Sequence, residues 1–240
     1  MKYFYIAILN LLFSCNQTNK SSNTIQETKE TIKIKKDSIS NTQTNSSAEL
    51  KIIIPENYSI LKESPANGRE MEKIMVNLDN DKKVDTAFIV KHENDFSNYL
   101  LLIYLTSQNK TYRFKLIDNF DLDFSLYPVQ LKNKNDVLEV GYFRDGTAAF
   151  GRFLKFRFDE NKKTFRLIGY DSGYRSGAGE HCDKSYNLID GIYNVKFEKA
   201  LPNEHTDTYK GRKKIKEIYI NDINIKVLNN LDDVGSEFEH

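Results

Sequence analysis

After about residue 50 the chain alternates hydrophobic and polar residues with a period of two, which is typical of β-strands. Leu154, Phe156 and Phe158 would share one face of such a strand. Lys155 and Arg157 would share the opposite face. The same pattern, together with short continuous apolar runs, predicts strands at residues 74–76, 86–90, 99–105, 137–143, 152–158, 164–170, 191–197 and 217–227.

The polar run Asp-Glu-Asn-Lys-Lys at residues 159–163 predicts a hairpin that joins two of these strands. Short connections favour antiparallel pairing, and no segment shows a helical period over ten or more residues. We therefore expect a mainly β fold of antiparallel sheets, either sandwich-like or propeller-blade-like. It should form a single domain at residues 50–230, followed by an acidic tail at residues 231–240 that frays.

The first fourteen residues have the pattern of an export signal. Lys2 is followed by an apolar stretch that ends at Phe13 and is interrupted only by Asn10. The stretch is shorter than the roughly 20 residues that a membrane-spanning helix needs. A charged start and a short apolar region are typical of secretory signals, so residues 1–14 are predicted to be a signal peptide.

The end of this stretch reads Leu12-Phe13-Ser14-Cys15. It resembles the lipobox of bacterial lipoproteins, in which Leu, a tolerant position and a small residue precede Cys. The resemblance implies that the signal is removed just before Cys15 and that the thiol of Cys15 carries fatty-acyl chains such as palmitate. Such chains contribute ~0.8 kcal/mol per buried CH₂ group and would anchor the protein to a lipid bilayer. We expect the outer membrane of the cell envelope rather than the inner one, with the domain in the periplasm or at the cell surface.

Residues 15–49 contain mostly Asn, Gln, Thr, Ser, Lys and Glu, with no aromatic residue, Gly or Pro. So little apolar area cannot offset the entropy lost when a chain becomes ordered. This lipidated N-terminal segment is therefore predicted to be a disordered tether with a span of about 30 Å.

The balance of charged residues limits the class of partner that the protein can bind. The chain has 35 Lys and Arg against 34 Asp and Glu, and loss of Lys2 with the signal leaves 34 of each. Zero net charge argues against nucleic acid as a partner, because binding to phosphates needs an excess of basic groups.

With Cys15 acylated, Cys182 is the one remaining thiol, so the fold has no internal disulfide.

One loop places oxygen-bearing side chains at the spacing of a site for a hard cation. It reads Asn77-Leu78-Asp79-Asn80-Asp81-Lys82-Lys83-Val84-Asp85 and precedes a predicted strand. Donors at positions one, three, five and nine of a tight loop can converge on one ion, and the backbone carbonyl of Lys83 adds a ligand from position seven. Phe88 rather than Glu stands at position twelve, so the loop is not an EF-hand. A polar turn without metal explains the same residues, because Asn and Asp favour turns for backbone reasons alone.

The segment resembles the calcium loop of FG-GAP and VCBS-type repeats, which reads Asp-x-Asn-x-Asp-Gly-x-x-Asp before a strand. The resemblance implies Asn77, Asp79, Asp81 and Asp85 as calcium ligands. Asn77 stands where the repeats have Asp, and Lys82 stands where they have Gly. A left-handed backbone at Lys82 would cost ~1–2 kcal/mol, and its ammonium would lie near the ion. The expected calcium site is therefore weak, with a Kd of roughly 10⁻⁴–10⁻³ M.

No other residues form a catalytic constellation. His181 and Cys182 are adjacent, but neighbours in an extended chain point to opposite faces and cannot readily act as base and nucleophile. We expect a non-catalytic envelope lipoprotein whose domain binds an unidentified protein or glycan. The alternative is a hydrolase of envelope material that uses Cys182 or the acidic loop.

Overall fold

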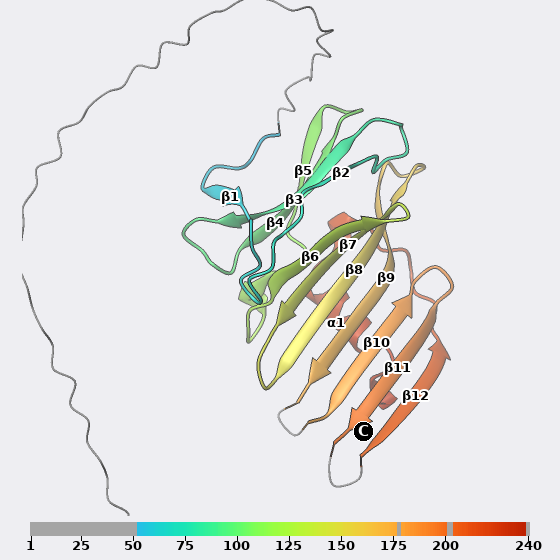
Figure 1. Ribbon diagram of the computed structural model, residues 1–240. Coiled ribbons are helices and arrows are strands. Elements are labelled where there is room, and N and C mark those ends of the chain that lie inside the picture. The colour runs from blue at the N-terminus through green and yellow to red at the C-terminus, as the bar shows by residue number, and fades with distance from the viewer. Residues whose placement is uncertain (1–51, 177–178, 201–203, 239–240) are drawn as a thin grey trace, which may run out of the picture. The chain divides into compact units, whose positions relative to one another are not determined.

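Strands paired in two antiparallel β-sheets make up about half of the described chain (Figure 1). The computed structural model describes residues 52–176, 179–200 and 204–238. The predicted mainly β, antiparallel fold is confirmed. The predicted signal peptide, Cys15 and the predicted tether lie outside the described residues. Within those residues, no helix is long and apolar enough to span a membrane.

The smaller sheet has five strands in the order β1-β3-β4-β5, with β2 also paired to β3. β1 and β2 share one edge of β3, since β1 pairs with its last residues and β2 with its first. β3 and β4 are buried along most of their length, which explains their nearly continuous apolar sequences. The strands are β1 (Tyr58–Ile60), β2 (Ile74–Val76), β3 (Asp85–His92), β4 (Tyr99–Leu105) and β5 (Lys110–Phe114).

The larger sheet has seven strands that follow one another in chain order, each antiparallel to the next. The predicted hairpin at residues 159–163 is confirmed, because Asp159 pairs with Thr164 where β8 turns into β9. The strands are β6 (Tyr127–Lys134), β7 (Val137–Arg144), β8 (Ala149–Asp159), β9 (Thr164–Arg175), β10 (His181–Asn187), β11 (Ile192–Lys199) and β12 (His205–Arg212).

The C-terminal segment covers one face of the larger sheet, where Figure 1 shows α1 (Ile225–Asp232) behind the central strands. The predicted strand at residues 217–227 is wrong, because a 3-10 helix, η2 (Ile220–Asp222), and the first turn of α1 occupy this stretch. The Asn224 side chain caps the helix by accepting from the backbone N–H of Val227 at 3.1 Å.

The expected fraying after residue 230 is also wrong, because Leu231 and Val234 are buried. They join one hydrophobic core with Leu228 and with residues from both sheets. The prediction failed because it was based on the acidic composition of residues 231–240 as a whole. The two apolar side chains lie three residues apart and both pack toward the sheet.

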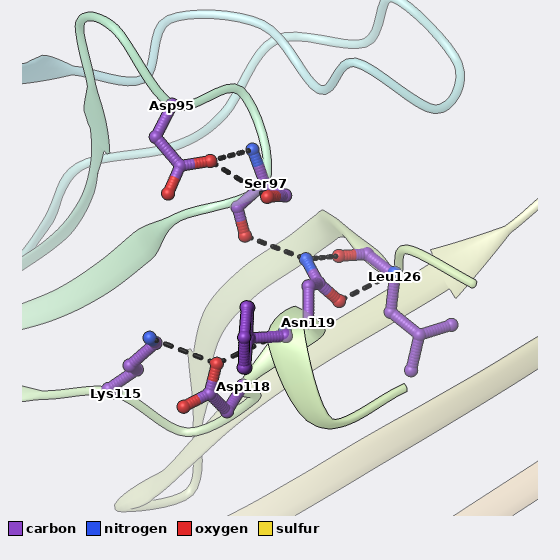
Figure 2. Close-up of polar contacts among 7 residues, drawn as sticks. Asp95, Ser97, Lys115, Asp118, Asn119 and Leu126 are labelled. Carbon is purple, nitrogen blue, oxygen red and sulfur yellow. Dashed lines mark hydrogen bonds and ion pairs between the residues drawn. The ribbon is translucent and has the colours of Figure 1, made fainter. Parts of the chain in front are cut away.

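A buried amide braces the connection between the two sheets (Figure 2). Asn119, in the 3-10 helix η1 (Asn119–Asp121), donates to the carbonyls of Ser97 at 2.8 Å and Leu126 at 3.0 Å. Its Oδ1 accepts from the backbone N–H of Leu126 at 2.8 Å. The Asn119 side chain therefore links the residues just before β4 to those just before β6. It also satisfies backbone groups that would otherwise be buried without partners.

Candidate functional site

The predicted cation loop lies between β2 and β3 at the edge of the smaller sheet. Asn80 and Lys82 both adopt left-handed backbone conformations, with φ of 62° and 70°. The conformation that the calcium repeats assign to Gly is therefore present at Lys82 and is strained for its side chain. The chain curls so that the side chains of Asp79 and Asp81 turn to the same side as that of Asp85.

Short-range hydrogen bonds orient the first two carboxylates. Asp79 Oδ1 accepts from the backbone N–H of Asp81 at 3.3 Å, and Asp81 Oδ1 accepts from the N–H of Lys83 at 2.7 Å. These are turns in which an Asp side chain bonds the backbone two residues on. Asp79 Oδ2 also accepts from the hydroxyl of Ser107 at 2.7 Å. Ser107 belongs to the turn between β4 and β5, so that turn is held against the loop.

Asp85 is fully buried at the start of β3 and joins the loop to its surroundings. Its two oxygens accept from the backbone N–H groups of Leu78 and Thr106, both at 2.8 Å. Burial raises the pKa of Asp85, and the nearby negative charges of Asp79 and Asp81 raise it further, while the two backbone hydrogen bonds lower it. The carboxylate thus occupies a place where added positive charge would be stabilising.

One oxygen from each of Asp79, Asp81 and Asp85 lies within 4.8 Å of the others. Two oxygens of the loop, Asn77 Oδ1 and Asp81 Oδ2, are buried without a hydrogen-bond partner. A buried oxygen that makes no hydrogen bond costs roughly 1–3 kcal/mol. A cation held by the three carboxylates would reduce the repulsion between them, and one that also contacted the two unpartnered oxygens would satisfy those. The residues present therefore fit a hard metal ion such as calcium or magnesium.

The structure brings together the acidic residues that the sequence predicts for the site, and it places Asn77 and Lys83 in the same loop. Lys83 is held through its backbone N–H, and the ligand role of its carbonyl stays a prediction. Ser107 was missed, because it lies 28 residues from Asp79 and no local pattern marks it. A hydroxyl residue just after a predicted strand was the only available signal.

The alternative centre at Cys182 has the wrong surroundings for a nucleophile. Cys182 is 0% exposed near the start of β10, where it packs with Val195 and Phe197. His181 points away from it, toward Asp183 at 3.3 Å and Glu198 at 3.5 Å on the opposite face of the sheet. A buried thiol in apolar surroundings has a raised pKa and little thiolate. His181 and Cys182 both lie at the start of β10, where neighbouring side chains point to opposite faces of the sheet.

No protein-family model matches the chain, and no curated protein or solved structure is detectably similar to it.

Proposed function

We propose that the protein is a lipid-anchored, non-catalytic binding module of the bacterial cell envelope with one weak calcium site in the Asn77–Asp85 loop. The calcium part is carried by the three converging carboxylates, in a loop with two buried oxygens that lack hydrogen-bond partners. The anchor is supported by the lipobox-like sequence that ends at Cys15 and by the apolar stretch before it.

Calcium suits this irregular set of oxygen donors better than magnesium does. Ligands on opposite sides of a calcium ion, each at about 2.4 Å, lie about 4.8 Å apart. The three carboxylate oxygens lie within 4.8 Å of one another, so one calcium ion could contact all of them. Magnesium binds at about 2.0–2.1 Å, demands near-ideal octahedral geometry and retains several waters. The four side chains and the Lys83 carbonyl, completed by water, provide the irregular oxygen shell that calcium accepts.

A bound ion would stiffen one corner of the smaller sheet. Asp85 already joins the loop to Thr106, and Asp79 joins it to Ser107. An ion bound by these carboxylates would stabilise the contact between the β2–β3 loop and the β4–β5 turn. This role is structural and involves no catalysis. This effect suits a domain that works outside the cytoplasm, where calcium at about millimolar concentration occupies sites of low affinity.

Thermal unfolding of the mature chain carrying Cys15→Ser, with chelator or with 10 mM Ca²⁺, tests the calcium part. A Kd near 10⁻³ M predicts about 1.4 kcal/mol of stabilisation and a rise in Tm of about 3–6 °C. Asp79→Asn or Asp81→Asn should abolish the rise, whereas Asp123→Asn, which removes an exposed carboxylate elsewhere, should preserve it. An unchanged Tm of the parent chain would contradict the calcium site.

A further inference from the structure

The face of the larger sheet opposite α1 is open (Figure 1). Within the described ranges, no helix or strand covers it. A hollow of about 870 Å³ extends across it from β7 to β12. We call this surface the outer face, and it carries the side chains of Phe143, Phe153, Asp171, Asp183, Asn194 and Thr208. The volume lies within the range of small-ligand sites, roughly 300–1,000 Å³.

Two phenyl rings lie on bare backbone at one end of the outer face. Phe143 pairs across the strands with Gly151, and Phe153 pairs with Gly141. A Cβ on Gly141 would lie 2.5 Å from the Phe153 ring, and one on Gly151 would lie 2.9 Å from the Phe143 ring. Because glycine has no side chain, both rings can lie directly against the backbone of the sheet. The result is a low apolar platform at the edge of the hollow rather than two projecting side chains.

The charged groups of the outer face are arranged in mutually neutralising pairs. His181 and Asp183 on β10 lie opposite Glu198 and Lys196 on β11. The His181 ring lies 3.3 Å from Asp183, and Lys196 forms an ion pair with Glu198. The hydrogen bond from Lys196 lowers the pKa of Glu198, which keeps that pair ionised at neutral pH.

The other two carboxylates of the outer face are paired as well. Asp171 is bound by Lys155, and Asp145 lies 3.7 Å from Arg175. A strongly charged ligand would have to break existing ion pairs to form new ones. A neutral ligand with many hydroxyl groups meets no such cost, because hydroxyls both donate to carboxylates and accept from ammonium groups.

We propose that the outer face binds a neutral glycan chain. A sugar ring would stack its apolar face on the Phe143 and Phe153 platform. Its hydroxyl groups would bond to the paired charges and to uncharged polar side chains such as Asn194 and Thr208. This inference rests on the proposed role of the protein as an envelope binding module and names its ligand class.

The test uses the full mature lipoprotein in a detergent without a sugar headgroup, with cellohexaose, maltohexaose and chitohexaose as probes. Titration calorimetry and saturation-transfer NMR should detect binding of at least one of them. Phe153→Ala should weaken that binding at least tenfold, and Asn194→Ala, which leaves the platform intact, at least threefold. Phe120→Ala is the control, because it removes a phenyl ring on η1 that is 94% exposed and does not line the hollow. It should change the affinity less than twofold.

Three results would overturn the glycan assignment: no binding of any neutral probe, preferential binding of a heparin-derived hexasaccharide, or equal weakening by Phe120→Ala and Phe153→Ala. Calcium-dependent unfolding and the acylation of Cys15 are measured on the same preparation. If both persist while no oligosaccharide binds, the inference fails and the calcium and anchor parts of the proposed function stand. If neither the calcium effect nor the acylation is observed, the proposed function fails, whatever the result of the glycan titrations.

Discussion

The guanidinium of Arg152 on β8 binds the carboxylate of Asp232, the last residue of α1, through Nε at 3.0 Å and Nη2 at 2.5 Å. The Arg152 side chain is 4% exposed. The hydroxyl of Tyr170 donates to the second oxygen of Asp232 at 2.6 Å. A carboxylate at the C-terminal end of a helix is normally unfavourable because it meets the negative end of the helix dipole. Here the buried cation supplies the compensating charge, so the pair docks α1 on the sheet.

Asp232→Ala should destabilise the domain by about 3 kcal/mol, because it leaves the buried Arg152 guanidinium without its carboxylate. Urea unfolding followed by circular dichroism measures the change. Asp233→Ala is the matched control, since Asp233 is the exposed neighbour, and it should cost less than about 0.5 kcal/mol. Equal effects of the two substitutions would show that the ion pair does not hold the helix.

Lys82→Gly should strengthen calcium binding several-fold and stabilise the calcium-free domain by up to about 1 kcal/mol. The substitution removes an ammonium near the carboxylates and relieves a non-glycine side chain at φ of 70°. Calorimetric titration with Ca²⁺ and urea unfolding measure the two effects.

Lys83→Gly is the control for this change, because it removes the same charge one residue later. The φ of Lys83 is not positive, so glycine there adds flexibility and should destabilise the domain by about 0.5–1 kcal/mol. A loss of stability in both variants would argue against backbone strain at Lys82.

The mature protein should begin at Cys15 and carry fatty-acyl chains on that residue. Intact-mass spectrometry of protein extracted from membranes should show loss of residues 1–14 and the added mass of lipid. Cys15→Ser should move the protein from the membrane fraction to the soluble fraction, because one serine cannot replace two or three acyl chains. A mature N-terminus at another residue, or a chain without lipid, would remove the basis for an envelope anchor.

Cys182 should react with iodoacetamide only when the domain unfolds. Its complete burial keeps the reagent out and disfavours the thiolate. Labelling in buffer should be at least a hundredfold slower than labelling in 8 M urea, as measured by peptide mass spectrometry. Rapid labelling of the native protein at neutral pH would instead support the hydrolase alternative.

The strands that could be predicted from the sequence are those whose burial repeats within one short segment. The period-two pattern and the short apolar runs located β2, β3, β4, β7, β8, β9 and β11. They missed β1, β5, β6, β10 and β12. The side chains of β10 and β12 are mostly polar because β12 is an edge strand and one face of β10 is open. The alternation of Ile and polar residues near 220–227 suggested a strand, although capping by Asn224 and packing of Leu228 and Leu231 favour a helix.

Residues close together in the sequence were enough to specify the alternating strands, the hairpin after Asp159, and the spacing of Asp79, Asp81 and Asp85. Which distant side chains these parts contact depended on the fold. It brought Ser107 to Asp79, Asp232 to Arg152, and Gly141 beneath Phe153. Strand pairing and helix docking join residues far apart in the chain, and a local pattern carries no information about which distant side chain will share its surroundings.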